Sequence, residues 1–277
     1  MPSDGATDGQ ALVGCRILVT RPHHQAGALC SLIEQAGGIA IRLPAIEIIA
    51  APMSPALLQT LQQLSQFDVA IFISANAVYY GGQLLARLGG WPRQLQYAAV
   101  GQKTATAMQG QGITPDIVPA AFSSEALLAD PRLQAMQGRR VVIFRGGGGR
   151  ELLGDVLRAR GAHVEYVEVY DRRCPASDLV PVRNAGIDAI VVTSNEGLDN
   201  LYTMAGDHHR QWLLAQTLAL ISERGAQHAR SLGFRGSLLP AHEASDPGLL
   251  AVLSGWWSTR PTRPAGPHFG ANSKASE

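Results

Sequence analysis

RILVTRPHHQAGALCSLIEQAGGIAIRLPAI, residues 16–46, decides the fold, because the chain repeats it as RVVIFRGGGGRELLGDVLRARGAHVEYVEVY at residues 140–170. Arg21 corresponds to Arg145, an offset of 124 positions (145 − 21). A repeat of this length is far longer than a solenoid period, so it predicts two duplicated domains. Clefts between domains are common sites for small molecules, which favours a protein that handles a ligand.

The rest of the pattern predicts an α/β fold. Helix and strand signals alternate almost without interruption, which is typical of doubly wound parallel sheets. DVAIFIS (68–74) returns as DAIVVTS (188–194), so the repeat continues beyond its first strands. Five strands are expected for each domain. They span residues 17–20, 39–43, 69–73, 97–100, 117–118, 141–145, 164–167, 189–193, 218–221 and 237–239.

Two further extended segments, 45–50 and 169–173, occupy equivalent places in the two copies. They are expected to pair as a two-stranded link between the domains. The spacing alone leaves open how the strands are shared. Residues 1–14 and 258–277 are expected to be disordered, because their Pro, Gly and Ser content comes without apolar periodicity.

The composition excludes several classes of protein. The chain has 277 residues, 46% hydrophobic and 16% charged, and a net charge of +1, which is globular and lacks the basic footprint of a nucleic-acid binder. No apolar run is long enough to cross a membrane. No export signal opens the chain, so the cytoplasm is expected. Three cysteines without a Cys-x-x-Cys motif, and no His-Glu-x-x-His, argue against a metal site.

The turns between strand ends and helix starts carry hydroxyls, amides and arginines. Ligands of open parallel sheets bind beyond the carboxyl ends of the strands, and helix N-termini attract anions. Many such turns suggest a ligand with several negative groups. An alternative is that the serine and threonine side chains are only helix caps. The candidate binding residues are Arg21, Ser74, Asn76, Gly101, Thr104, Ser123, Ser124, Arg145, Arg150, Ser194 and Asn195.

Several of these segments together resemble the uroporphyrinogen-III synthase family over about Arg16 to Leu253. The segments are ILVTRP, LPAIEI, FDVAIFISANAV, AAVGQKTA, PDIVPAAFSSEALL, VVIFRGGGGRELLGDVLRARGA, VEVYDRR and IDAIVVTSNEGL. The resemblance implies a discontinuous first domain, residues 15–45 plus 174–257, and a second domain, residues 46–173.

The reaction that the resemblance implies is cyclisation of hydroxymethylbilane, a linear tetrapyrrole with eight carboxylates. Water is lost, the last pyrrole ring (ring D) is inverted, and no cofactor takes part. No nucleic acid or membrane partner is expected. We expect a monomer, with transient contact to the enzyme that makes the substrate left open.

The resemblance also assigns Tyr170 as the acid that protonates the leaving hydroxyl; Ser74, Thr104, Ser123, Ser194 and the arginines become carboxylate contacts. A phenol with a reference pKa near 10 stays protonated at neutral pH. The alternative is that Tyr170 is an aromatic that packs the hinge. Tyr170→Phe is expected to lower turnover modestly and to leave folding intact.

Two rival functions remain at this stage. A ligand-sensing clamshell protein would close on a small molecule without transforming it. A nucleotide-dependent transferase would use the glycines of residues 146–149, but these lack both phosphate-loop spacings.

Overall fold

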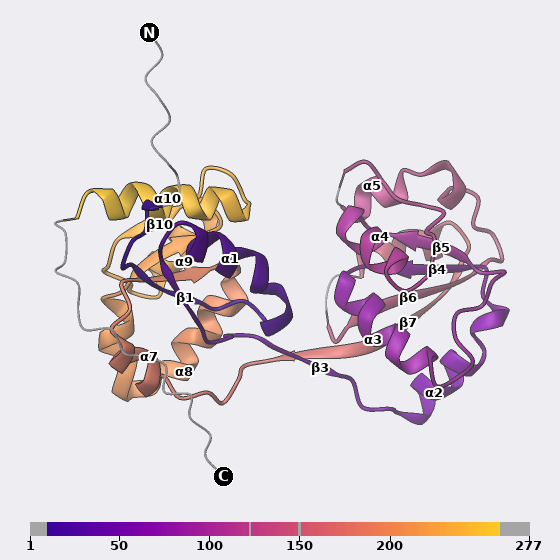
Figure 1. Cartoon of the computed structure of the whole chain (residues 1–277). Helices are drawn as coiled ribbons and strands as arrows, with labels where there is room; N and C mark the ends of the chain where they lie inside the picture. Colours follow the sequence, from indigo (N-terminus) through magenta and orange to yellow (C-terminus); the bar gives the residue numbers. More distant parts are fainter. Residues whose placement is uncertain (1–9, 122, 149–150, 261–277) are drawn as a thin grey trace, which may run out of the picture. The chain divides into compact units, whose positions relative to one another are not determined.

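The computed structural model describes residues 10–121, 123–148 and 151–260. Contacts between residues divide the chain into two compact units, and Figure 1 labels most of their helices and strands. Unit 1 combines residues 1–47 with 174–277, and unit 2 is formed by residues 48–173.

Unit 1 is built on a parallel sheet with the order β10-β9-β8-β1-β2. Its strands are β1 (Arg16–Val19), β2 (Ile39–Arg42), β8 (Ala189–Val192), β9 (Thr217–Leu220) and β10 (Leu238–Pro240). Its helices are the 3-10 turn η2 (His23–Gln25), α1 (Gly27–Gln35), α7 (Val180–Ala185), α8 (Asn195–Leu214), α9 (Glu223–Ser231) and α10 (Asp246–Ser258). Alternate residues of a strand point to opposite faces of the sheet, so the sheet contributes to two cores. Helices α1 and α10 pack on one face, and α7, α8 and α9 pack on the other.

Unit 2 has a sheet with the order β3-β7-β6-β4-β5. Its strands are β3 (Glu47–Ala50), β4 (Val69–Phe72), β5 (Gln96–Ala99), β6 (Arg140–Gly146) and β7 (His163–Arg173), and an isolated bridge joins Ala98 to Ile117. Its helices are α2 (Pro55–Gln62), η3 (Leu64–Gln66), α3 (Ala75–Leu85), α4 (Gln102–Gln109), α5 (Ser124–Leu128), η4 (Pro131–Leu133) and α6 (Leu152–Ala159). Helices α2, α3 and α4 pack on one face, α5 and α6 on the other.

The two units exchange halves of the repeat. The first strand-helix-strand, β1-α1-β2, corresponds to β6-α6-β7, and β4 and β5 correspond to β8 and β9. The order β9-β8-β1-β2 in unit 1 therefore matches β5-β4-β6-β7 in unit 2. Each unit combines the first half of one copy with the second half of the other, and the predicted α/β fold with parallel sheets is confirmed.

The chain passes between the units after Glu47 and after Arg173. The strands at these points, β3 and β7, are neighbours in the sheet of unit 2, and the Ala51 N–H donates to the Val169 carbonyl at 3.1 Å. Segments that the sequence predicts to pair, 45–50 and 169–173, thus contribute to adjacent strands.

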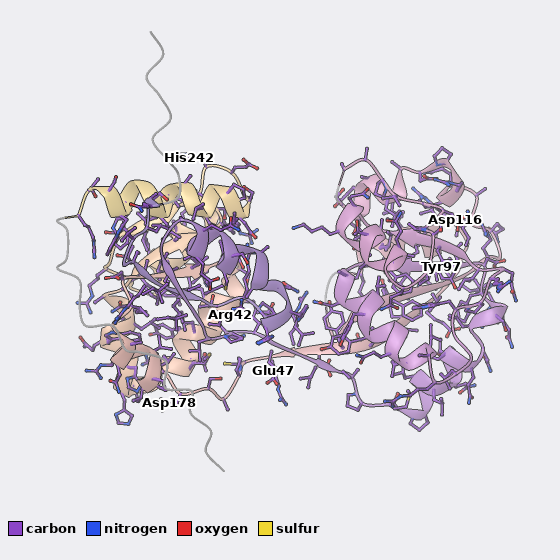
Figure 2. All side chains as sticks on the ribbon, viewed as in Figure 1. Arg42, Glu47, Tyr97, Asp116, Asp178 and His242 are labelled. Atoms are coloured by element: carbon purple, nitrogen blue, oxygen red, sulfur yellow. The ribbon has the colours of Figure 1, made fainter. Side chains whose placement is uncertain are left out.

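Buried side chains fill both faces of each sheet. Strands β4, β8 and β9 are buried at every position, as strands covered on both faces must be. Figure 2 draws the side chains and labels Tyr97 and Asp116 of unit 2, where the Asp116 carboxylate accepts the Tyr97 N–H at 2.8 Å.

The predicted disorder at residues 1–14 is wrong for its last five residues. Leu12 is fully buried in the core of unit 1, and its N–H donates to the Ala36 carbonyl at 2.8 Å. Burial of this leucine stabilises the turn around it. Residues 1–9 and 261–277 lie outside the described residues, and Ser258, where the predicted tail starts, is the last residue of α10.

Candidate functional site

Serine residues cap the N-termini of helices that follow the carboxyl ends of the strands. Ser74, Ser123 and Ser194 precede α3, α5 and α8, and each accepts a backbone N–H three residues further on, at 3.1, 3.0 and 3.0 Å. The helix-cap interpretation therefore holds for all three. A capping oxygen uses only one of its two lone pairs and keeps its proton, so each hydroxyl can still bind another group.

One cavity of about 220 Å³ lies at the carboxyl end of the sheet in unit 2. It is lined by Ile73, Val100, Ser123, Ser124, Ile143, Arg145, Leu153 and Tyr166. Two serines, Tyr166 and a guanidinium thus share a cavity whose other lining residues are apolar, which suits a carboxylate. The structure brings together three of the predicted binding residues here.

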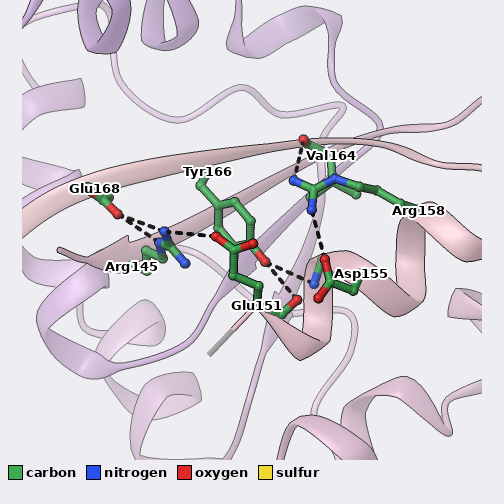
Figure 3. Close-up of polar contacts among 8 residues, drawn as sticks. Arg145, Glu151, Asp155, Arg158, Val164, Tyr166 and Glu168 are labelled. Carbon is green, nitrogen blue, oxygen red and sulfur yellow. Dashed lines mark hydrogen bonds and ion pairs between the residues drawn. The ribbon is translucent and has the colours of Figure 1, made fainter. Parts of the chain in front are cut away.

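Arg145 is held in place before any ligand arrives (Figure 3). Its Nε and Nη2 atoms donate to one carboxylate oxygen of Glu168 at 3.1 and 2.8 Å, and its guanidinium lies 3.9 Å from the centre of the Tyr166 ring. The residue is only 8% exposed, and its buried Nη1 atom has no hydrogen-bond partner among the residues that the structure describes. A buried N–H donor left unpaired costs free energy, so an acceptor that reaches Nη1 would stabilise the site.

Tyr166 and Glu168 are functional candidates that the sequence analysis missed. The Tyr166 hydroxyl donates to the Glu151 carbonyl at 3.1 Å and accepts the Gly154 N–H at 3.1 Å, which fixes the start of α6 beside the cavity (Figure 3). Their signal in the sequence is the alternation in β7, which places them on one face of the strand next to Arg145.

A β-bulge in β7 decides where Tyr170 points. Arg145 pairs with Glu168, but the next residue, Gly146, pairs with Tyr170, so Val169 is an extra residue on β7. Simple alternation would have placed Tyr170 beside Glu168. The bulge instead turns Tyr170 into the opposite core, where α3 and α4 pack.

Tyr170 is enclosed in that core and is 2% exposed. Its hydroxyl lies 3.1 Å from Ser74 Oγ and 3.5 Å from Arg172 Nη2. Its ring stacks on Tyr80 with ring centres 5.8 Å apart. A Cβ atom at Gly146 would lie 2.5 Å from the ring, so glycine is required at the bulge for Tyr170 to occupy this position.

A smaller cavity in unit 1 lies at the starts of α8 and α9, which correspond to α3 and α4 and not to the helices beside the cavity of unit 2. It has a volume of about 20 Å³ and is lined by Val192, Ser194, Asn195, Leu198, Leu220, Ile221, Ser222 and Gly225. Arg21 does not line it, and forms an ion pair with Asp246 at 2.6 Å. The predicted residues Ser194 and Asn195 are thus together, whereas Arg21 is occupied by a carboxylate of its own chain.

The remaining predicted residues are Asn76, Gly101, Thr104 and Arg150. Asn76 and Thr104 are buried in α3 and α4, and Gly101 precedes α4 with extended backbone. None of the three lines the cavity of unit 2. Arg150 lies outside the described residues.

Neither a membrane-spanning helix nor a metal-binding cluster is found in the part of the chain that the structure describes. None of the described helices has the length and apolarity needed to cross a bilayer. No three His, Cys, Asp or Glu side chains of the described residues are grouped as ion ligands.

Comparison with known proteins gives one consistent family. The model of the family described as uroporphyrinogen-III synthase HemD matches residues 27–251. The chain is 37% identical over 244 residues to the uroporphyrinogen-III synthase of Salmonella typhimurium, covering 86% of this chain and 99% of that protein. It is 36% identical over 245 residues to the uroporphyrinogen-III synthase of Escherichia coli, with the same coverage.

Solved structures show the same fold. A mutant uroporphyrinogen III synthase from Thermus thermophilus superposes with a TM-score of 0.56 at 19% identity, covering 88% of this chain and 97% of that one. The enzyme from Helicobacter pylori gives a TM-score of 0.56 at 15% identity, with 87% and 99% covered.

Proposed function

This chain belongs to the uroporphyrinogen-III synthase family, and from that premise we propose that it cyclises hydroxymethylbilane to uroporphyrinogen III. The match over residues 27–251 is the observation that carries the proposal, because it includes both units. The enzyme is then a lyase of tetrapyrrole biosynthesis. Its reaction eliminates water and inverts ring D.

The reaction requires the protein mainly to position the substrate. Protonation of the leaving hydroxyl gives an electrophilic azafulvene, which ring D attacks at its already substituted carbon. The resulting spiro intermediate fragments and recloses in the inverted sense. Since closure without a catalyst gives the uninverted isomer, the protein must hold the chain in one folded arrangement.

Polar residues at the strand ends can bind the carboxylates of the substrate and so hold it in this arrangement. The substrate carries eight carboxylates, and the cavity with Ser123, Ser124 and Arg145 offers one of them two hydroxyls and a buried guanidinium. We propose that a substrate carboxylate enters this cavity and accepts from Arg145 Nη1. Ser194 and Asn195 of unit 1, together with Arg21, are proposed as further carboxylate contacts, and Tyr170 as the source of the proton.

The test is a product analysis. Purified protein receives freshly made hydroxymethylbilane, and the porphyrins obtained after oxidation are separated into type III and type I isomers. Excess type III is expected, and heat-denatured protein, the control, should give only type I. Type I alone from the native protein would leave a binding protein of the clamshell kind as the better explanation.

We further propose that the enzyme acts as a monomer in the cytoplasm. Light scattering of the active protein should then give a mass close to 29.4 kDa. A mass twice as large that persists on dilution would contradict this.

A further inference from the structure

The enclosed position of Tyr170 conflicts with direct proton transfer to a substrate. The residue is 2% exposed, so a ligand has little access to its hydroxyl. Ser74 is half-buried, and its Oγ lies 3.1 Å from that hydroxyl. The two oxygens are therefore in series, with Ser74 on the accessible side.

Two of the hydrogen bonds around this pair have a set direction of donation. Arg172 Nη2 has only N–H groups to offer, so at 3.5 Å it donates to the Tyr170 oxygen. The 3.1 Å contact between the two hydroxyls allows either to donate, and the arrangement that serves proton delivery is the one in which Tyr170 donates to Ser74 Oγ. Ser74 Oγ also accepts the Ala77 N–H at 3.1 Å, which fills its second lone pair. The Ser74 proton is left to point at a group outside this network.

We propose that Ser74 delivers the proton to the leaving hydroxyl of hydroxymethylbilane and that Tyr170 replaces it in the same step. The inference rests on the proposed function and deepens it. Ser74 becomes the catalytic residue that touches the reacting atoms. Tyr170, which acts through Ser74, becomes a proton reservoir and positioning residue.

The step is balanced in atoms and charge. The Ser74 proton moves to the substrate hydroxyl, the C–O bond breaks, and water leaves with both bonding electrons, which gives the azafulvenium carbon. The Tyr170 proton moves to Ser74, and a phenolate remains. When the final C–C bond closes the macrocycle, the attacked pyrrole carbon loses its proton, which returns through Ser74 to Tyr170. No oxidant, reductant or metal enters.

The surrounding structure holds this series in line. Ser74 is fixed by its role as the first cap of α3, so its oxygen has a set position relative to the helix. Tyr170 is fixed by the bulge, by Tyr80 on one side of its ring and by the space that Gly146 leaves on the other. The Tyr80 hydroxyl is itself held, because it donates to the Ile48 carbonyl at 2.7 Å.

The experiment compares Ser74→Ala, Tyr170→Phe, the double variant and Ser74→Thr. Either single change breaks the series, so each should lower kcat by up to about tenfold with little change in KM. The double variant should be no slower than the slower single variant, which is strong non-additivity. Ser74→Thr keeps a hydroxyl and a cap and should retain most of the activity.

Loss of a helix cap needs its own control. Ser54 caps α2 with the same geometry, accepting the Leu57 N–H at 3.1 Å, and is far in sequence from the Ser74 pair. Ser54→Ala should lower thermal stability about as much as Ser74→Ala while kcat stays at the wild-type value. The comparison separates loss of the proton donor from loss of the helix cap, because only Ser74→Ala should lower turnover.

A proton inventory gives a second readout. In mixtures of H2O and D2O the wild-type kcat should follow a curved line, because two protons move together, whereas Tyr170→Phe should give a straight line. Wild-type turnover by Ser74→Ala beside a slow Tyr170→Phe would overturn the series in favour of direct contact by Tyr170. Multiplying losses in the double variant, or full activity of both single variants, would also overturn it. Failure of the proposed function is distinct from all of these, because the wild type would then make no type III isomer.

Discussion

The carboxyl ends of the two sheets carry the same arginine with different neighbours. Arg21 follows β1 of unit 1 and pairs with Asp246, in the first turn of α10. Arg145, its counterpart in β6 of unit 2, pairs with Glu168 of the adjacent strand and stacks on Tyr166. Arg21 thus pairs with a helix residue, whereas Arg145 pairs with a residue of the neighbouring strand.

The two cavities lie on different faces of the repeated pattern. The cavity of about 220 Å³ in unit 2 lies on the side of α5 and α6, whereas the cavity of about 20 Å³ in unit 1 lies beside α8 and α9, the counterparts of α3 and α4. The duplication therefore fixes where strands end and helices begin, but side chains outside the repeated pattern decide on which face of each sheet a cavity remains. The units do not have to bind the same part of a substrate.

The largest effect is expected in the core of unit 2 that α2, α3 and α4 cover. Phe144 stacks on Phe72 with ring centres 4.4 Å apart, and the position of Phe144 is taken in unit 1 by Thr20, which donates to the Val191 carbonyl at 2.7 Å. Phe144→Ala should lower the free energy of unfolding by about 3–5 kcal/mol through the cavity it leaves. Thr20→Val should cost about 1–2 kcal/mol. Urea unfolding followed by circular dichroism measures both, and equal losses would remove the contrast.

Alkaline pH should weaken both units, through different groups. Burial and then Asp188 raise the pKa of the Cys15 thiol in unit 1 from 9.0 to about 12, partly offset by Arg260. Burial and then Asp116 raise the pKa of Tyr97 in unit 2 from 10.0 to about 12. The folded protein holds these protons more tightly than the unfolded chain, so their stabilisation is complete below pH 9 and 10 respectively. It is lost as pH rises towards 12.

The two groups can be separated by substitution. Each is expected to contribute on the order of 2 kcal/mol to the alkaline loss of stability. Cys15→Ala should flatten the decrease of the urea midpoint that begins near pH 9, and Tyr97→Phe the decrease that begins near pH 10. Variants that keep the wild-type slope at high pH would show that neither core controls it.

The two arginines should differ in their effect on substrate binding. Arg145→Met removes the guanidinium from the cavity and leaves Glu168 partly solvated, with 44% of its side chain exposed. KM for hydroxymethylbilane should rise about tenfold, equivalent to about 1.4 kcal/mol. Arg21→Met removes a group already paired with Asp246 and should raise KM by less than about threefold. Steady-state kinetics with both variants decide this, and a larger effect of Arg21→Met would reverse the comparison.

Much of the fold was predictable because the sequence states it twice. The short apolar strands are visible as runs such as VAIF and AIVV, and the helix starts are visible as serines that cap them. The repeat also located Arg21 and Arg145 at equivalent strand ends. Local patterns of this kind depend on neighbours in sequence, which a single chain displays directly.

The candidate site was less predictable, because it depends on contacts that sequence spacing does not contain. The bulge at Gly146 and Val169 reverses the side on which Tyr170 lies, and no alternation of residues indicates it. The partners of the two arginines come from elements that differ between the copies. Leu12 was missed for a related reason, since a single apolar residue in a polar segment has no periodicity.

The smallest effect separates a helix cap from a binding group. Ser123 caps α5 at 3.0 Å in unit 2, and Ser245 occupies the same place before α10 in unit 1, at 3.1 Å from the Gly248 nitrogen. Alanine at either position should cost about 1 kcal/mol of stability, because the same kind of cap is lost. Ser123 also lines the cavity, so Ser123→Ala should raise KM for hydroxymethylbilane about threefold, whereas Ser245→Ala should leave it unchanged. Thermal unfolding and steady-state kinetics of both proteins provide the comparison. If the two variants lose stability equally and neither changes KM, the serines are caps in both units, and the cavity of unit 2 must bind its carboxylate through Arg145 without Ser123.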